Sequence, residues 1–323
     1  MDTRLARISV PLLYSTQPSR PKDNQLSMTK RIYLLGHPVS HSVSPAFQQA
    51  ALDSCSIDAS YAALDVPPAE LPAAVRSLRD SDVLGANVTV PHKEAVFPLL
   101  DSVSDEARLI GAVNTIHNRD GMLEGHNTDA RGFLSALREE AGYEPRGKAA
   151  LILGAGGSAR AVAVALAGEG ASSVVIANRT LERAEALADL VRTLGVPAQA
   201  VALKTDSLRD AGQCDLVVNC TSLGMTGGPG PSETPLTAEL IPPDALVFDL
   251  VYNPRETPLL REAASVGART LGGLPMLVYQ GAAAFELWTG VAAPAQAMFE
   301  AAEAALAARQ TASGHGQTTT TRS

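Results

Sequence analysis

A glycine-rich segment in the middle of the chain has the spacing of a diphosphate-binding turn. Residues 151–160, LILGAGGSAR, contain an apolar strand end, the pattern G-x-G-x-x-A and the start of an Ala/Val-rich helix. Gly154 would permit the tight turn, Gly156 would let the backbone approach a diphosphate, and the helix N-terminus would supply N–H donors. A tight turn without a ligand is the alternative, but the flanking strand and helix favour a dinucleotide site. The predicted cofactor contacts are Gly154, Ala155, Gly156, Gly157, Ser158 and Ala159.

The next predicted strand ends in a sequence that favours NADP over NAD. It reads Asn178-Arg179-Thr180, with Arg183 one helical turn later. An NAD site usually carries Asp or Glu at this strand end, to bind the ribose 2′-hydroxyl. Two guanidinium groups beside a hydroxyl suit a 2′-phosphate instead, because planar N–H donors bind phosphate oxygens in pairs. A solvated helix start is the alternative, but positive charge is unfavourable at a helix N-terminus unless an anion is bound there.

Polar residues recur after the predicted strands of the first third of the chain. Ser42 and Ser44 precede a helix, where Ser44 could be an N-cap with Pro45 at the first helical position. Capping explains one serine, and two alternate hydroxyls could bind a carboxylate. Lys93 and Asp129 also follow strands, where a lone lysine is commonly solvated and a lone Asp commonly forms a turn or cap.

Taken together, these segments resemble the shikimate dehydrogenase family over residues 31–308. The resemblance rests on eight blocks in the same order. They are residues 36–45 (GHPVSHSVSP), 87–93 (NVTVPHK), 111–115 (GAVNT), 127–133 (NTDARGF), 178–180 (NRT), 219–225 (NCTSLGM), 249–254 (DLVYNP) and 276–281 (MLVYQG). The resemblance implies NADPH-dependent, reversible reduction of 3-dehydroshikimate to shikimate, a step of chorismate and aromatic amino acid biosynthesis.

The resemblance also implies roles for individual residues. The predicted catalytic pair is Lys93 and Asp129, and Asp129 is also expected to contact substrate. Ser42 and Ser44 would bind the substrate carboxylate. The other expected substrate contacts are Thr89, Asn114, Tyr252 and Gln280, and further cofactor contacts are expected at Thr221, Gly273 and Met276.

The residue chemistry agrees with that assignment. Hydride transfer to a ketone builds negative charge on its oxygen, so a donor such as the Lys93 ammonium must lie within hydrogen-bond reach. The cofactor carries the hydride. Asp129 beside Lys93 would favour the charged ammonium, and in the oxidation direction Lys93 would act as general base. The sequence leaves open which member of the pair holds the proton.

Short apolar runs alternate with longer amphipathic stretches, which is typical of parallel strands joined by crossover helices. The predicted strands are 32–35, 61–64, 85–90, 112–116, 149–153, 173–177, 215–219 and 245–250. The predicted helices are 45–55, 71–79, 129–141, 158–167, 181–194, 258–266, 276–289 and 293–308. The predicted fold class is α/β, with an N-terminal α/β substrate domain, a Rossmann-like NADP-binding domain and C-terminal helices that pack back on the first domain.

Breaks in composition predict the domain boundaries. Residues 30–129 together with 273–310 are expected to form the substrate-binding and catalytic domain, and 130–272 the NADP-binding domain, with a ligand cleft between them. Residues 1–29 are expected to be a flexible extension. Residues 311–323, mostly Thr, Gly, Gln and Ser, are expected to be a disordered tail.

Composition excludes several classes of function. The chain has 323 residues, 46% hydrophobic and 19% charged, with a formal net charge of -8. This acidic balance disfavours nucleic acid and membrane surfaces as partners, and no apolar stretch approaches the 18 residues of a membrane span. Cys55, Cys214 and Cys220 lack metal-ligand spacing, so no metal site is predicted and a reduced, cytoplasmic setting fits. A monomer or homodimer that binds a small-molecule substrate is expected.

Two other functions remain as alternatives. A quinate/shikimate dehydrogenase would often prefer NAD, against which the arginines near residue 180 argue. A non-catalytic sensor of the same fold would be expected to lose Lys93 or Asp129, and both are present. Gln48 and Cys220 depart from the usual family pattern, but neither position is expected to be catalytic.

Overall fold

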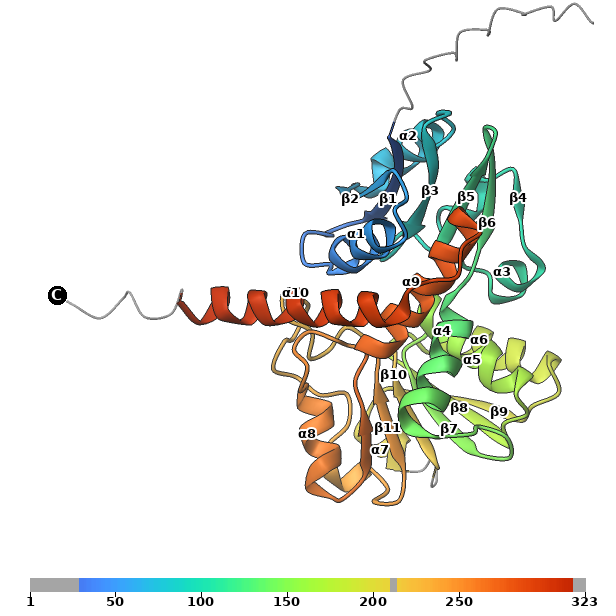
Figure 1. Cartoon of the computed structure of the whole chain (residues 1–323). Coiled ribbons are helices and arrows are strands. Elements are labelled where there is room, and N and C mark those ends of the chain that lie inside the picture. Colours follow the sequence, from blue (N-terminus) through green and yellow to red (C-terminus); the bar gives the residue numbers. More distant parts are fainter. Residues whose placement is uncertain (1–28, 210–213, 316–323) are drawn as a thin grey trace, which may run out of the picture.

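A computed structural model describes residues 29–209 and 214–315 of the chain. Its strands form two sheets in two lobes, with the C-terminal helices α9 and α10 between them (Figure 1). The predicted N-terminal extension lies outside the described residues except for residue 29. The predicted start of the tail at residue 311 falls within α10, and residues 316–323 lie outside the described part.

The first sheet is mixed, with strand order β2-β1-β3-β5-β6-β4. Its strands are β1 (Lys30–Gly36), β2 (Ala59–Asp65), β3 (Val83–Val88), β4 (Ser102–Val103), β5 (Thr115–Arg119) and β6 (Met122–His126). Strand β1 pairs in parallel with β2 and β3, whereas β5 is antiparallel to both β3 and β6. The prediction of parallel strands throughout was therefore wrong for this sheet.

A two-residue hairpin explains the antiparallel part. Arg119 pairs with Met122, and the turn residues Asp120 and Gly121 have φ values of 52° and 89°. Positive φ at both positions is the requirement of a type I′ turn, for which Asp-Gly is a preferred sequence. The dipeptide was a signal for a hairpin, and the strand that follows it, β6, was missed from the sequence.

The second sheet is entirely parallel and has the order β12-β11-β10-β7-β8-β9. Its strands are β7 (Ala149–Leu153), β8 (Ser173–Asn178), β9 (Ala198–Ala202), β10 (Leu216–Asn219), β11 (Leu246–Asp249) and β12 (Arg269–Leu271). This is the Rossmann order, in which ligands bind beyond the carboxyl ends of the strands, where the strand order reverses between β7 and β10. The predicted Rossmann-like unit is confirmed, although β9 and β12 were missed.

The helices occupy the positions that their apolar faces require. They are α1 (Ser44–Ser54), α2 (Leu71–Ser77), α3 (Asp105–Ile110), α4 (Asp129–Ser135), α5 (Gly157–Gly168), α6 (Leu181–Thr193), α7 (Thr205–Arg209), α8 (Pro258–Ser265), α9 (Leu274–Thr289) and α10 (Ala295–His315). Short 3-10 turns lie at Pro68–Glu70, Phe97–Leu99 and Ala238–Leu240, and a π-helical turn, Ala136–Glu140, continues α4. The short helices α3 and α7 were not predicted. None of the described helices is long and apolar enough to cross a membrane.

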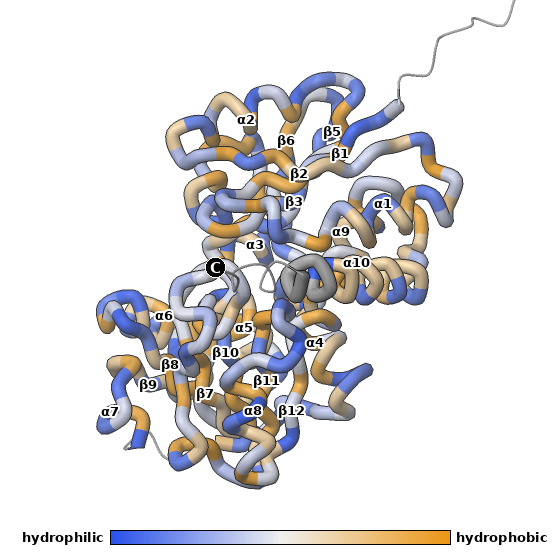
Figure 2. The backbone as a smooth tube through the Cα atoms, turned by 90° about the vertical axis from the view of Figure 1, so that its left-hand side faces the viewer, coloured by the Kyte–Doolittle hydropathy of each residue, from blue (hydrophilic) through white to orange (hydrophobic). Residues whose placement is uncertain are grey.

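Two large apolar clusters form the cores around the second sheet and around α1, α9 and α10. Helix α5 is almost wholly buried, and its alanines and valines pack with the strands of the second sheet, which Figure 2 colours largely hydrophobic. Helices α9 and α10 pack against α1, where Phe285 and Met298 join Phe47 in one cluster. Trp288 of α9 also donates its indole N–H to the Ile116 carbonyl of β5, at 2.9 Å. The prediction that the C-terminal helices pack back on the first domain is confirmed.

Candidate active site

Lys93 lies in the turn after β3, and hydrogen bonds of Lys93 and of the preceding residue, His92, fix this turn. The Lys93 carbonyl accepts a hydrogen bond from the Val113 N–H at 2.8 Å, and the neighbouring His92 imidazole bonds the Val66 carbonyl at 2.7 Å. The Lys93 ammonium then reaches the Asp129 carboxylate, with 2.6 Å between Nζ and Oδ2. The two side chains are 13% and 4% exposed. Burial on this scale strengthens the pair, because little water screens the charges.

Asp129 is the first residue of α4, and each of its carboxylate oxygens has its own partner. Oδ2 receives Lys93, whereas Oδ1 accepts from Asn114 Nδ2 at 2.8 Å. The Asp129 backbone N–H donates to the Asn127 side chain at 3.0 Å. The carboxylate is thus held in one orientation toward the ammonium.

Asn114 joins three segments of the chain. Its Nδ2 also lies 2.9 Å from Thr128 Oγ1 and 3.1 Å from Gln280 Oε1, and its Oδ1 accepts from the Thr128 N–H at 2.8 Å. Gln280 comes from α9, so this helix reaches the same place as the strands of the first sheet. The structure therefore brings together four residues predicted from the sequence: Lys93, Asn114, Asp129 and Gln280.

Buried polar residues that were not predicted as site residues complete this group. Asn87 on β3 donates to Thr115 Oγ1 at 3.2 Å and accepts from the Tyr61 hydroxyl at 2.8 Å. Burial raises the pKa of Tyr61, so the hydroxyl remains a donor. A buried Asn within an apolar strand was the available signal, since an amide placed there needs partners. We call Lys93, Asn87, Asn114, Thr115, Thr128, Asp129 and Gln280 the polar cluster.

Ser42 lies beside Tyr252 and is bonded to Ser44. The alternative of an N-cap at Ser44 was wrong: α1 begins at Ser44, its N-cap residue is Val43, and no side chain caps it. Ser42 Oγ instead accepts from the Ser44 N–H at 3.2 Å and donates to Ser44 Oγ at 3.1 Å. Burial raises the pKa of Tyr252, and a hydrogen bond with Ser42 opposes that shift. Thr89 follows β3 and is half-buried, with its N–H on the Leu35 carbonyl at 2.8 Å.

The glycine-rich turn fits a diphosphate. Gly154 has a φ of +107°, which favours glycine, and a side chain at Gly156 would meet nothing within 4 Å. No side chain caps α5, so its first N–H groups are left for a ligand. These are the features by which a turn and helix N-terminus bind a diphosphate.

The same turn touches Lys93, the predicted catalytic lysine. A side chain at Gly157 would lie 3.2 Å from Cβ of Lys93, and Ser158 Oγ lies 3.3 Å from Lys93 Nζ. Any residue larger than glycine at position 157 would therefore push against Lys93. The diphosphate turn and the polar cluster form one continuous site.

At the strand end expected to bind the ribose, the two predicted arginines differ in whether they form an ion pair. Asn178 donates to the Thr180 carbonyl at 2.8 Å, which closes the turn after β8. Arg183 forms an ion pair with Glu94 at 2.9 Å, whereas Arg179 is exposed and makes no ion pair with another described residue. Glu94 is adjacent to Lys93, so the ion pair connects this strand end to the loop of the predicted catalytic lysine.

The remaining predicted cofactor contacts lie at the carboxyl ends of β10 and β11 and at the start of α9. Thr221 Oγ1 donates to Asn219 at 2.7 Å. Gly273 precedes α9, and a side chain there would collide with the Leu250 carbonyl, 2.1 Å away. Met276 is buried in the same apolar cluster as Ala155 of the glycine-rich turn.

A second buried carboxylate, Asp249, organises these loops. Its Oδ1 accepts from Asn219 Nδ2 at 2.8 Å and from the Val251 N–H at 3.0 Å, and its Oδ2 accepts from Thr257 Oγ1 at 2.6 Å. Burial raises the pKa of Asp249 to about 6, although these hydrogen bonds oppose the shift. Sequence reasoning assigned it no role.

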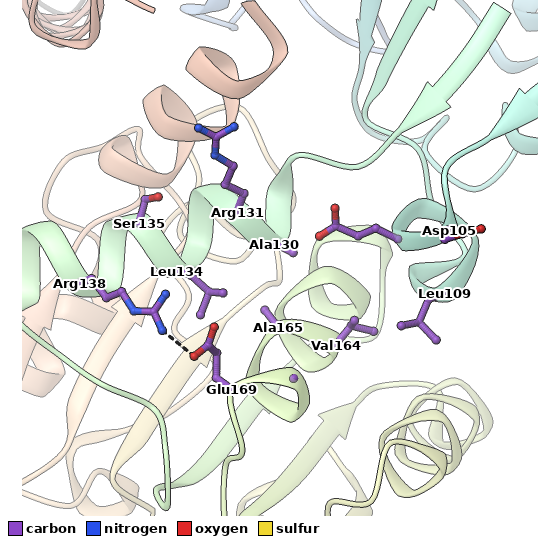
Figure 3. A pocket seen from close by; sticks show the side chains of 12 residues that line it. Asp105, Leu109, Ala130, Arg131, Leu134, Ser135, Arg138, Val164, Ala165 and Glu169 are labelled. Atoms are coloured by element: carbon purple, nitrogen blue, oxygen red, sulfur yellow. Dashed lines mark hydrogen bonds and ion pairs between the residues drawn. The ribbon is translucent and has the colours of Figure 1, made fainter. Parts of the chain in front are cut away.

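Two cavities among the described residues are lined by residues outside the polar cluster. The larger, about 720 Å³, lies between α3, α4 and α5, where Arg138 bonds Glu169 across its wall (Figure 3). The smaller, about 370 Å³, is lined by residues such as Arg79 and Asn118 of the first sheet's lobe.

Comparison with family models places three matches along the chain. Residues 34–116 match the shikimate dehydrogenase substrate binding domain, residues 137–225 match shikimate/quinate 5-dehydrogenase, and residues 273–303 match the shikimate 5′-dehydrogenase C-terminal domain. Together the matches include the glycine-rich turn and most of the polar cluster.

Whole proteins match as well. Shikimate dehydrogenase (NADP(+)) of Methanopyrus kandleri is 51% identical over 276 residues, 84% of this chain and 94% of that protein. The enzyme of the same name from Moorella thermoacetica is 52% identical over 276 residues, 84% of this chain and 91% of that protein. The solved structure of shikimate 5-dehydrogenase from Thermus thermophilus with NADP(H) and shikimate is 45% identical, with a TM-score of 0.76 over 86% of this chain and all of that one.

Proposed function

The chain belongs to the shikimate dehydrogenase family, and on that premise we propose that the polar cluster is where the ketone of its substrate is reduced. The protein catalyses the NADP-dependent, reversible reduction of 3-dehydroshikimate to shikimate, a step of the shikimate pathway. The observation that carries the proposal is the buried ion pair of Lys93 and Asp129, 2.6 Å apart and in contact with Ser158 of the glycine-rich turn.

Lys93 is the proton donor in this proposal. NADPH supplies the hydride, and negative charge then builds on the substrate oxygen. The Lys93 ammonium donates a hydrogen bond and finally its proton to that oxygen. Asp129 keeps the ammonium charged and oriented, and Asn114 holds the carboxylate by its other oxygen. In the reverse direction, neutral Lys93 accepts the proton of the shikimate hydroxyl.

The other polar residues bind the substrate. Ser42 and Ser44 take the carboxylate, because their hydroxyls lie 3.1 Å apart and both can turn to donate to one anion. Tyr252 lies beside Ser42 and completes this end of the site. The ring hydroxyls are bound by Thr89, Asn114, Asp129 and Gln280.

In this proposal the residues at the carboxyl edge of the second sheet would hold the cofactor. The turn from Gly154 to Ala159 would hold the diphosphate, and Arg179 and Arg183 would hold the 2′-phosphate with Asn178 and Thr180. Thr221, Gly273 and Met276 would contact the nicotinamide end. The exposed position of Arg179 and the uncapped start of α5 support this placement.

The two sheets support a division of the chain by task. Residues 30–129 with 273–310 form the substrate-binding and catalytic domain in this proposal, and 130–272 the NADP-binding domain. A cytoplasmic location is supported by the three cysteines, all free. The net charge of -8 supports a protein that binds neither nucleic acid nor membrane. We expect it to act as a monomer or homodimer.

One assay tests the function directly. The purified protein is given shikimate or quinate with NADP or NAD, and reduction of the cofactor is followed in all four combinations. Shikimate with NADP should give the highest kcat/KM, because Arg179 and Arg183 are the proposed contacts of the 2′-phosphate, which NAD lacks. Quinate with NAD as the best pair would contradict the proposal. The structure of quinate dehydrogenase from Corynebacterium glutamicum with NAD, 33% identical with a TM-score of 0.76, makes this the relevant alternative.

A further inference from the structure

An arginine near the C-terminus holds the segment that carries Ser42. Arg309 of α10 donates from Nη2 to the Ser42 carbonyl at 2.9 Å and to the Ser40 carbonyl at 3.4 Å, and from Nη1 to the His41 carbonyl. Three consecutive carbonyls thus converge on one guanidinium. Residues 40–42 and Arg309 are separated by more than 260 positions in the sequence, and the contact exists only because α10 packs along α1.

This contact holds the backbone of the segment that carries the Ser42 hydroxyl. A guanidinium presents its N–H groups in a rigid plane, so it fixes the carbonyls more strictly than a single donor would. With the Ser42 backbone held by Arg309, Ser42 Oγ is directed to Ser44, from which it accepts at 3.2 Å. The turn also contains the hydrogen bond from the Ser42 N–H to the Val39 carbonyl at 3.0 Å.

The same arginine places positive charge at this end of the site. Carbonyl oxygens that face an anion repel it, and a guanidinium bonded to them offsets that repulsion. Arg309 is close enough to Tyr252, which lies beside Ser42, for its charge to act on the tyrosine hydroxyl. A tyrosine hydroxyl and an arginine charge thus accompany the two serines, which suits an anionic ligand.

We propose that Arg309 is a positioning residue for the substrate carboxylate: it holds the Ser40–Ser42 carbonyls so that the two serine hydroxyls converge, and its charge favours an anion there. The inference rests on the proposed binding of the carboxylate by Ser42 and Ser44. It adds a residue outside the C-terminal family match, which ends at residue 303.

The test is Arg309→Gln in the full chain. KM for shikimate should rise about tenfold, the size expected when a charge-assisted contact is lost, while kcat and the KM for NADP stay within about twofold. Shikimate methyl ester, which keeps a carbonyl oxygen for the serine hydroxyls but has no carboxylate charge, should show a smaller rise in KM. Arg309→Lys keeps the charge but not the planar fork, so it should restore part of the loss. Arg261→Gln, which removes another arginine bonded to a backbone carbonyl, is the matched control and should leave all values unchanged.

Two results would overturn the inference. An unchanged KM for shikimate in folded Arg309→Gln would remove the positioning role. An equal rise in KM for shikimate and its ester, together with a fall in kcat and melting temperature, would assign Arg309 to general packing of α10.

Ser42→Ala, measured beside it, separates this inference from the function it rests on. If Ser42→Ala raises KM for shikimate and Arg309→Gln does not, only the role of Arg309 fails. If Ser42→Ala leaves KM unchanged, the proposed carboxylate site fails, and the inference with it.

Discussion

Two buried carboxylates, Asp129 and Asp249, have similar surroundings and different chemistry. They are 3% and 0% exposed, and each accepts one hydrogen bond of 2.8 Å from an asparagine amide. Asp129 also faces the Lys93 ammonium, whereas Asp249 faces the Thr257 hydroxyl and a backbone N–H. Of these two carboxylates, only Asp129 has beside it a cation that can give and take a proton, as the proposed catalysis requires.

The neighbours of each carboxylate explain why both are buried. Asp129 gathers side chains from the first sheet, α4 and α9 at the point where the glycine-rich turn arrives. Asp249 ties the ends of β10 and β11 to the start of α8, where Thr257 also caps the Leu260 N–H. The first arrangement supports a reaction, and the second supports the loops that carry Thr221 and Tyr252.

The largest effect on activity is expected from removing Lys93, the cation that distinguishes Asp129 from Asp249. Lys93→Ala should reduce shikimate turnover by a factor on the order of a hundred or more, because the general acid is lost. Lys93→Met keeps the apolar stem and should lose as much, which separates charge from packing. Steady-state oxidation across pH, with circular dichroism and ligand binding, measures the effect. Near-normal turnover in a folded Lys93→Ala variant would contradict the assignment.

Asp249 should show its role in stability rather than in turnover. Its pKa is raised to about 6 in the folded protein, so the folded state binds this proton more tightly than the unfolded chain does. The resulting stability is complete below pH about 4 and is lost as pH rises through about 6. Relative to Asp249→Asn, the free energy of unfolding should fall by roughly 2 to 3 kcal/mol between pH 4 and pH 7.

Chemical denaturation of both proteins at several pH values measures this difference. Asp244→Asn, at an exposed carboxylate, is the matched control for the loss of one charge. A difference between wild type and Asp249→Asn that stays constant across this pH range would rule out the raised pKa.

Substitutions of exposed charged residues near the proposed cofactor site should have smaller effects than those at the buried carboxylates and Lys93. Arg179→Asp should weaken NADP relative to NAD by about 2 kcal/mol, since a charge-assisted phosphate contact is replaced by repulsion. Binding of each cofactor by titration calorimetry measures the change. Arg192→Asp, on the far end of α6, controls for net charge. Equal losses for NADP and NAD would remove the 2′-phosphate role.

The smallest effect is expected at Glu94, whose ion pair with Arg183 is half exposed. Such pairs contribute about 0 to 1 kcal/mol, so Glu94→Gln should free Arg183 at little cost in stability. KM for NADP should fall by about twofold and that for NAD should not change. Steady-state kinetics with both cofactors tests this. A higher KM for NADP in Glu94→Gln would mean that Glu94 positions Arg183 for the cofactor rather than competing for it.

Local sequence patterns were sufficient to predict the Rossmann-like unit. A buried strand, the glycine-rich turn and an Ala/Val helix are adjacent in the chain, so residues 149–168 could be read as one unit before any tertiary contact was known. Parallel strands were the wrong prediction for β5 and β6, because the Asp120-Gly121 turn selects a hairpin. The predicted strand at 112–116 begins only at Thr115 in the structure.

By itself the sequence predicted the fold class, a diphosphate-binding turn and, at Asn178-Arg179-Thr180, a preference for NADP, and the family resemblance added Lys93 and Asp129 as the expected catalytic pair. Those features depend on residue types and short spacings, which a single chain displays directly. The tertiary structure decided which groups come into contact. It brings Lys93 to Asp129, Thr257 to the buried Asp249, and the Arg309 guanidinium to the Ser42 carbonyl. Their partners are distant in sequence, and only packing sets the burial and separation that control a charge's energy.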